Sequence, residues 1–178
     1  MVIDIHGHIG RIVEDRKEFI DVANLISKMD RWGIDITCVL PLSENPEGGY
    51  LECDTEDVIK SCTEYPDRLI PFCLIDPRYK NSPVTDFKPL LKEYKDRGCK
   101  GIGELLPKMD FDDERCINLY RQAAEFGFPV LFDMADSEYG YGLRDGYGLP
   151  KLENALKLCP DTVFIGHGPT FWAEIAKE

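Results

Sequence analysis

Six short apolar runs recur along the chain, separated by longer segments in which apolar residues follow a helical period. Each run is rich in valine, isoleucine and leucine and is too short for a helix, which is typical of a strand buried in a parallel sheet. The pattern therefore predicts six buried parallel strands. They span residues 2–5, 36–40, 69–75, 101–106, 129–132 and 163–165.

An amphipathic helix is predicted after each of these strands. In the first helix the apolar stripe runs from Phe19 to Trp32, and Gly33 ends the helix. The other stripes fall within residues 55–62, 87–94, 116–126, 152–159 and 169–175. A strand followed by a crossover helix, repeated about every 30 residues, is the βα unit of a parallel α/β fold.

Two arrangements of such units stay open on this pattern: an open doubly wound sheet and a TIM-type (β/α)8 barrel. A barrel takes about 250 residues, and these 178 residues hold only the first six of its eight units. The barrel is favoured because the candidate catalytic side chains lie at the C-terminal ends of different strands, where barrel active sites form. We expect one domain over residues 1–178, incomplete at its C-terminus, with further sequence or a second chain covering the open first and sixth strands.

Composition narrows the kind of partner. With 33 acidic and 21 basic residues the formal net charge is -12, which repels nucleic acid and anionic lipid. No apolar stretch is as long as a membrane-spanning helix, which needs about 20 residues. Seven widely spaced cysteines without a C-x-x-C pair are expected as core residues in a reducing compartment. We expect a cytoplasmic protein, alone or as a homo-oligomer, that acts on a small molecule and binds neither nucleic acid nor membrane.

The first run ends in two of the three histidines of the chain, His6 and His8, with Gly7 between them. Residues two apart on a strand face the same side, so both imidazoles project from one face. Two imidazoles on one rigid strand form a chelating pair for a divalent transition metal. The alternative is a pair that bonds backbone groups at the end of the strand. We favour the metal site.

Three polar residues lie at the later strands. Glu104 is inside the fourth, where an unpaired carboxylate is costly, so it needs a metal, an arginine or a lysine. His167 follows the sixth strand between two glycines and is a candidate third ligand or a general acid or base. Asp133 ends the fifth strand and is a candidate ligand, base or partner of a histidine.

Two further features are candidates for substrate binding. The loop over residues 134–150 is long and rich in glycine and tyrosine, so Tyr139, Tyr141 and Tyr147 are candidate substrate contacts; a plain surface loop is the alternative. Arg78 follows the third strand and is a candidate for bidentate binding of a substrate carboxylate, an internal ion pair being the alternative.

Together these residues resemble the metal-dependent amidohydrolase superfamily, most closely its amidohydrolase-related (amidohydrolase 2) branch, which also contains aromatic-acid decarboxylases. The resemblance is carried by the histidine pair, by the carboxylate on the fourth strand and by residues 148–172, GLPKLENALKLCPDTVFIGHGPTFW. It implies a (β/α)8 barrel that holds a divalent metal at the strand ends, zinc first, then manganese, iron or nickel. The implied metal ligands are His6, His8, Glu104 and His167.

Two positions depart from the pattern of that superfamily. Its fifth strand usually ends in histidine, where this chain has Asp133, and the water-activating aspartate of its eighth strand has no counterpart here.

Three functions stay open. We expect hydrolysis of a C–N or C–O bond of a small, acidic molecule by a metal-activated water, with His167 and Asp133 as catalytic residues. Decarboxylation of a small or aromatic acid and a non-catalytic or truncated member are the alternatives.

Overall fold

The computed structural model describes residues 1–12, 19–135 and 142–168. Within them, β1, β4 and β6 form one parallel sheet, and β7, β8 and β11 form another. The two sheets meet where Cys73, just after β6, pairs in parallel with Ile102 of β7. The six predicted strands therefore follow one another in chain order. Their bounds are β1 (Ile3–Gly7), β4 (Ile36–Val39), β6 (Leu69–Pro71), β7 (Ile102–Leu105), β8 (Val130–Phe132) and β11 (Phe164–Gly166).

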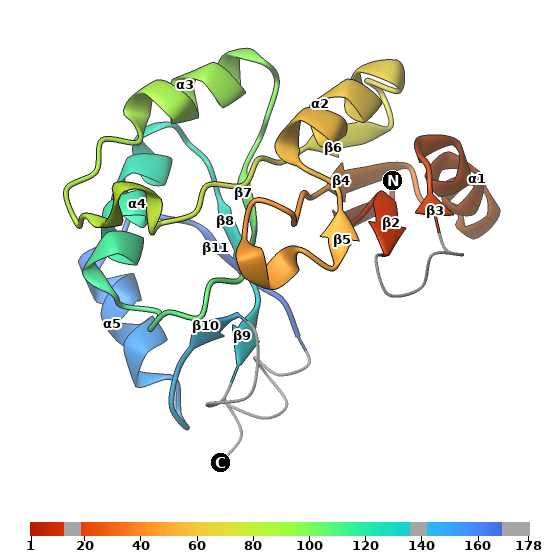
Figure 1. Ribbon diagram of the computed structural model, residues 1–178. Coiled ribbons are helices and arrows are strands. Elements are labelled where there is room, and N and C mark those ends of the chain that lie inside the picture. Colours follow the sequence, from red (N-terminus) through yellow and green to blue (C-terminus); the bar gives the residue numbers. More distant parts are fainter. Residues whose placement is uncertain (13–18, 136–141, 169–178) are drawn as a thin grey trace.

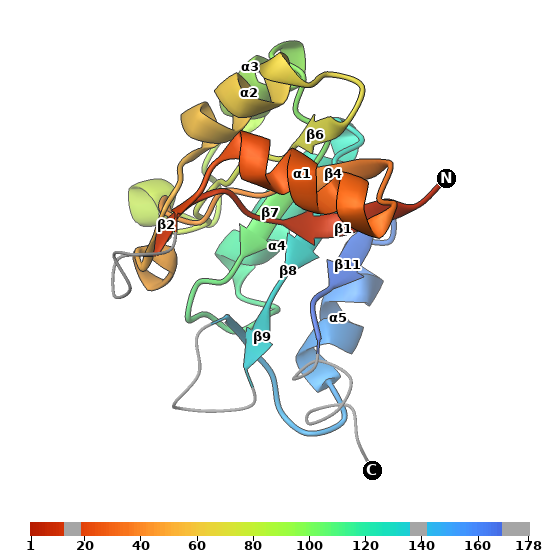
Figure 2. The same cartoon turned by 90° about the vertical axis from the view of Figure 1, so that its right-hand side faces the viewer.

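A helix connects each of these strands to the next and lies on the outside of the sheet (Figures 1 and 2). This confirms the parallel α/β class and the alternation of strand and helix. The helix predicted over residues 169–175 lies outside the described residues. The described helices are α1 (Val22–Trp32), α2 (Thr55–Glu64), α3 (Lys88–Asp96), α4 (Glu114–Glu125) and α5 (Pro150–Leu158).

The first helix begins later than the apolar stripe indicates. Asp21 is the N-cap of α1 and accepts a hydrogen bond from the amide of Asn24, so the helix starts at Val22 and not at Phe19. Residues Phe19–Ile20 form the short strand β3 instead. The C-terminal prediction is confirmed, because Gly33 adopts the left-handed conformation that ends the helix.

The expectation that all six strands are buried is wrong for the two outermost ones. Ile3 and Ile5 of β1 are 48% and 43% exposed, and Val163, just before β11, is 62% exposed. Within the described residues, β1 pairs only with β4 and β11 only with β8. One edge of each strand is therefore open, so its apolar side chains reach solvent.

Short elements that the apolar pattern does not reveal lie in the connections. Strands β2 (Gly10–Ile12), β3 and β5 (Leu51–Glu52) form a small antiparallel sheet in the order β3-β2-β5. Strands β9 (Met134–Ala135) and β10 (Leu143–Arg144) pair in parallel. Two 3-10 turns, η1 (Pro46–Gly48) and η2 (Tyr79–Asn81), follow β4 and β6.

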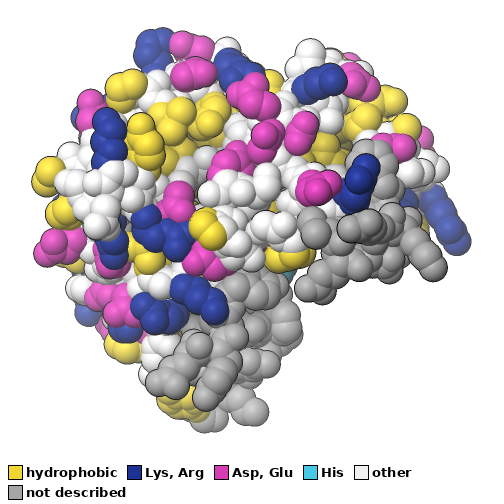
Figure 3. All heavy atoms as spheres, viewed as in Figure 1, with side chains coloured by type: hydrophobic (Ala, Val, Ile, Leu, Met, Phe, Trp, Pro, Cys, Tyr) yellow, Lys and Arg dark blue, Asp and Glu magenta, His cyan; other side chains and the backbone are white. Residues whose placement is uncertain are grey.

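The largest apolar core includes residues from β7, β8 and the helices α3, α4 and α5, with Phe111, Tyr120 and Phe132 among its fully buried members. All seven cysteines are buried and free, as predicted. No described helix has the length and apolar character needed to span a bilayer. Acidic and basic side chains are mixed on the face shown in Figure 3.

Candidate metal centre

His6 in β1 and His8 directly after it converge at the C-terminal end of the sheet. The register of β1 against β4 shifts between Asp4 and Gly7, a bulge that redirects the side chains beyond it. A Cβ atom at Gly7 would lie 2.6 Å from the methyl group of Thr37, so any larger residue between the histidines would require the Thr37 side chain to move. The Nε2 atoms of His6 and His8 lie 3.1 Å apart.

Glu104 of β7 points its carboxylate at this pair. Its Oε2 lies 3.0 Å from Nε2 of His6 and 3.2 Å from Nε2 of His8, and the residue is 3% exposed. No lysine or arginine among the described residues pairs with it, which removes that alternative for the described chain. Burial raises the pKa of Glu104, but the hydrogen bonds and charges of the two histidines outweigh burial and bring the pKa down to about 2.

The backbone selects the tautomer of His8. Its Nδ1 lies 2.8 Å from the carbonyl oxygen of Leu40, and a carbonyl can only accept, so Nδ1 carries the hydrogen. In the neutral ring the lone pair is then on Nε2, the atom that faces His6 and Glu104. Metal-binding histidines usually have this arrangement: one ring nitrogen donates to a carbonyl or carboxylate, and the other is left to bind the ion.

His167, directly after β11, and Asp133, directly after β8, lie near the carboxylate of Glu104. Nδ1 of His167 is buried without a hydrogen bond among the described residues, and it lies 3.5 Å from Oε1 of Glu104 and 3.5 Å from Oδ1 of Asp133. The amide of Met134 donates to Asp133. Burial raises the pKa of the Asp133 carboxyl, opposed in part by that amide, and the nearby charge of Glu104 raises it further.

The donor set fits a divalent transition metal. Ligand atoms that share one ion at about 2.0–2.2 Å lie about 2.8–3.6 Å from each other, the lower values in octahedral and the upper in tetrahedral coordination, and the atoms of His6, His8 and Glu104 are separated by 3.0–3.2 Å. Ligand atoms of His6, Glu104 and His167 all lie within 4.8 Å of one another. Nδ1 of His167, which has no hydrogen bond within the described part of the chain, is a further candidate nitrogen ligand. Imidazole and carboxylate together suit zinc, manganese, iron or nickel.

The candidate substrate-binding residues lie in different environments. Arg78 donates to Glu47 and Asp76, so the ion-pair alternative describes its contacts, and substrate binding by Arg78 stays a prediction. Tyr147 is exposed, whereas Tyr139 and Tyr141 lie outside the described residues. The three imidazoles keep 21–33% of their side-chain surface exposed, so a small molecule can reach them.

Two residues that support the site, Leu40 and Asn45, were not found from the sequence. The carbonyl of Leu40 and the side chain of Asn45, which donates to the carbonyl of Glu104, act through contacts 32 and 59 residues along the chain. The signal that could have found Asn45 is its place in the segment after β4, at the same edge as the histidines. Its residue type alone is equally typical of a turn.

No family model matches this sequence, and no curated protein is similar to it at a significant level. Solved structures do share its fold. An uncharacterised TIM-barrel protein from Bordetella bronchiseptica superposes with a TM-score of 0.58 at 14% identity, over 93% of this chain and 66% of that one. A probable 2-pyrone-4,6-dicarboxylic acid hydrolase from Acinetobacter baumannii, with citric acid bound, gives 0.53 at 15% identity, over 93% and 68%.

A third neighbour holds a metal. A 5-carboxyvanillate decarboxylase from Novosphingobium aromaticivorans, with bound manganese and a nitrobenzoic acid, gives a TM-score of 0.55 at 15% identity, over 88% of this chain and 55% of that one. The parallel α/β fold expected from the resemblance to the amidohydrolase-related branch is thereby confirmed as similar to part of a TIM-barrel protein, whereas the division into six of eight barrel units stays a prediction. The chain spans only 55–68% of the length of these three structures.

Proposed function

We propose that these residues form the first six units of a (β/α)8 barrel enzyme that binds one divalent metal and hydrolyses a C–N or C–O bond of a small acid. The observation that carries the proposal is the triangle of His6 Nε2, His8 Nε2 and Glu104 Oε2, with edges of 3.0–3.2 Å. The fold neighbours, which include a hydrolase and a metal-containing decarboxylase of small acids, support it.

His6, His8 and Glu104 hold the metal in this proposal. When bound, the ion supplies a Lewis acid that polarises a carbonyl and lowers the pKa of water. Glu104 carries the negative charge that two neutral imidazoles lack, and its burial strengthens its attraction for a cation. The carbonyl of Leu40 keeps the lone pair of His8 aimed at the ion.

Asp133 and His167 move the protons. The Asp133 carboxylate, whose pKa burial raises, is a better base than an exposed aspartate and accepts a proton from the attacking water at Oδ1. Nδ1 of His167, 3.5 Å away, takes up this proton and delivers it to the leaving group. The pair thereby occupies the role for which the superfamily pattern offers an aspartate on the eighth strand.

Decarboxylation on the same site is the second candidate, supported by the manganese-containing decarboxylase among the fold neighbours. Here His167 delivers its proton to the carbon that loses carbon dioxide, and no water is consumed. The two reactions differ in a measurable product. Release of carbon dioxide without net addition of water identifies the decarboxylase, and a new carboxyl, hydroxyl or amine group identifies the hydrolase.

The first test is elemental analysis of the purified protein for zinc, manganese, iron and nickel. Near-stoichiometric metal is expected in the wild type, and a loss of at least tenfold in the double variant His6→Ala/His8→Ala and in Glu104→Gln. Glu64→Gln, an exposed carboxylate on α2, is the matched control and keeps the metal. A wild type that stays metal-free after reconstitution would contradict both reactions and leave a non-catalytic protein.

The variant His167→Ala separates the two roles of that histidine. If His167 is a proton carrier, metal content is unchanged and turnover of a small acid falls by about 100-fold or more. If His167 is a ligand, the metal is lost together with the activity. Both measurements are made on the same preparation.

A further inference from the structure

Both backbone groups of Glu104 are held by the segment that follows β4. The register of β7 against β8 shifts between Ile102 and Leu105, so Glu104 lies in a bulge, outside the regular ladder. Its amide donates to the carbonyl of Pro41 at 3.3 Å, and its carbonyl accepts from Nδ2 of Asn45 at 3.4 Å. The position of the carboxylate therefore depends on where residues 41–47 lie.

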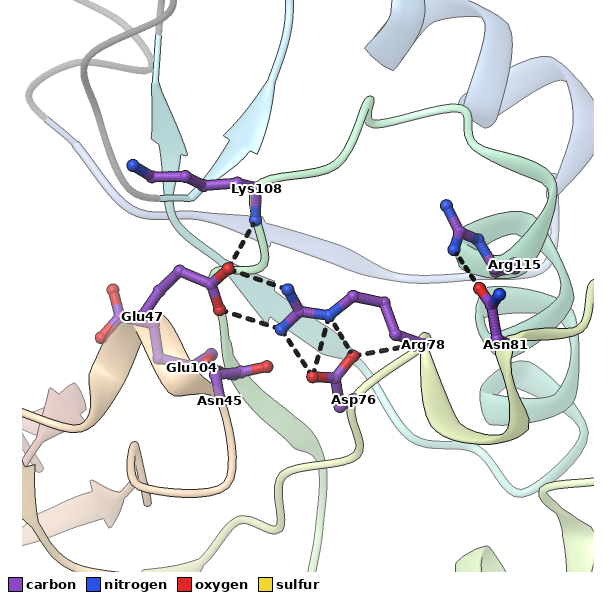
Figure 4. A network of polar contacts seen from close by, with 8 residues as sticks. All are labelled: Asn45, Glu47, Asp76, Arg78, Asn81, Glu104, Lys108 and Arg115. Atoms are coloured by element: carbon purple, nitrogen blue, oxygen red, sulfur yellow. Dashed lines mark hydrogen bonds and ion pairs between the residues drawn. The ribbon is translucent and has the colours of Figure 1, made fainter.

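Arg78 fixes that segment from the other side (Figure 4). Its guanidinium donates to both oxygens of Glu47, at 2.8 and 2.9 Å, and to both oxygens of Asp76, at 2.6–3.0 Å. Glu47 belongs to η1, directly after Asn45, whereas Asp76 and Arg78 follow β6. The amide of Lys108, beyond β7, donates to Glu47 at 3.5 Å. We call Glu47, Asp76 and Arg78 the rim cluster, because it joins the loops after the neighbouring strands β4 and β6 and accepts a hydrogen bond from the loop after β7.

The rim cluster is more than a surface ion pair. The side chains of Arg78, Glu47 and Asp76 are 29%, 14% and 20% exposed, so water screens their attraction only in part. All three guanidinium nitrogens donate, in the two-pronged geometry that fixes orientation as well as distance. Little of the guanidinium is left for a substrate carboxylate.

We propose that Arg78 is a positioning residue for Glu104: through Glu47 it fixes the loop whose Pro41 and Asn45 hold the Glu104 backbone, and so sets the metal affinity of the site. The proposal rests on the proposed function, since it concerns the same metal. It adds a residue that touches neither metal nor substrate. It also differs from the prediction that Arg78 binds substrate. If Arg78 only bound substrate, replacing it would leave the metal affinity unchanged.

The test measures Mn²⁺ affinity by titration calorimetry on the full chain. Arg78→Gln and Glu47→Gln are each expected to weaken binding by about 10–100-fold, the usual effect of losing a residue that supports a metal ligand. The double variant is expected to be no weaker than either single one, because both remove the same contact. Arg97→Gln, which breaks the two-pronged pair of Arg97 with Glu56 between α2 and α3, is the matched control and stays within twofold.

A second measurement, amide hydrogen exchange at Glu104 in the metal-free proteins, keeps the two proposals apart. Exchange is expected at least tenfold faster in Arg78→Gln than in the wild type and Arg97→Gln, even if the wild type binds no Mn²⁺ and the proposed function fails. Unchanged exchange together with unchanged Mn²⁺ affinity overturns the positioning role. So does a variant that raises KM for a small acid while its Mn²⁺ affinity and exchange match the wild type, because that result assigns Arg78 to the substrate.

Discussion

Glu44 is a half-buried carboxylate that contacts a helix rather than the candidate metal centre. Its Oε1 accepts from the amide of Thr55 at 2.6 Å and from the hydroxyl of the same residue, at the start of α2. Its Oε2 is buried without a partner among the described residues. Burial raises the pKa of Glu44 in spite of the two hydrogen bonds from Thr55. The folded protein therefore holds the proton of Glu44 more tightly than the unfolded chain does.

This sign gives a pH dependence at the residue scale. Between the ordinary glutamate pKa and the raised folded value, the folded state binds more protons, so the free energy of unfolding falls as pH rises, by at most about 1.4 kcal/mol per pH unit. Glu44→Gln removes this contribution, and Glu64→Gln, an exposed control on α2, keeps it. Urea unfolding from pH 4 to 8 checks it; equal slopes in wild type and Glu44→Gln would refute the assignment.

At the residue scale, the sequence predicted which side chains form the site better than it predicted the residues that hold them in place. Alternation along one strand predicted that His6 and His8 share a face, which agrees with the geometry. The cost of a buried carboxylate predicted a cationic partner for Glu104; the structure places two imidazoles beside it, and the cation stays a prediction. The partners of Arg78 could not be chosen, because its pairing with Glu47 spans 31 residues and any of the 33 acidic residues was eligible.

At the scale of the element, β7 owes its bulge to a glycine. Gly103 has a φ of +151°, and a Cβ there would lie 2.7 Å from the carbonyl oxygen of Leu131. Gly98 also has a positive φ, +101°, but a Cβ there would meet nothing within 4 Å. Gly98→Ala is thus a matched control that carries the backbone strain without the collision.

We expect Gly98→Ala to lower the free energy of unfolding by about 1–3 kcal/mol and Gly103→Ala to lower it by clearly more, because β7 must also move away from β8. Since Glu104 is the next residue, Gly103→Ala also weakens metal binding, whereas Gly98→Ala does not. Denaturant unfolding and metal titration of both variants check this. Equal losses of stability in the two variants would show that the close approach to Leu131 has no cost.

Long elements could be predicted at this scale and short ones could not. The six apolar runs and five helical stripes each repeat a period over enough residues to be recognised, and all have counterparts in the structure. Strands β3, β5, β9 and β10 have two residues each, too few to show alternation. The bulges in β1 and β7 depend on which strand lies alongside, information that one strand does not carry.

At the scale of the whole molecule, β1 and β11 each have one edge that no described residue pairs with, and these edges are open to other chains. Unpaired strand edges with apolar side chains promote association. We expect the 178-residue protein to show a mass above 20.3 kDa in light scattering at tens of micromolar. Ile5→Lys, on the edge strand β1, is expected to reduce the association.

Val84→Lys is the control, since Val84 is 83% exposed but lies in the loop before α3. It introduces the same charge away from the strand edges and is expected to leave the mass unchanged. A monomer at every concentration in the wild type would contradict the prediction. Association reduced equally by both lysines would assign it to net charge rather than to the edge.

The order in which the ribosome makes these residues determines when the candidate metal centre can form. His6 and His8 leave the ribosome before the other candidate ligands, since Glu104 lies 98 residues after His6 and His167 follows later still. A growing chain therefore displays the histidine pair long before its partners exist, and the ion cannot guide the early steps of folding. If the proposed function holds, the complete site would form only when these distant parts have docked, and a bound ion would then stabilise the native state in proportion to the logarithm of its concentration. In a cell, the supply of metal would decide how long the finished protein lasts, not how quickly it forms.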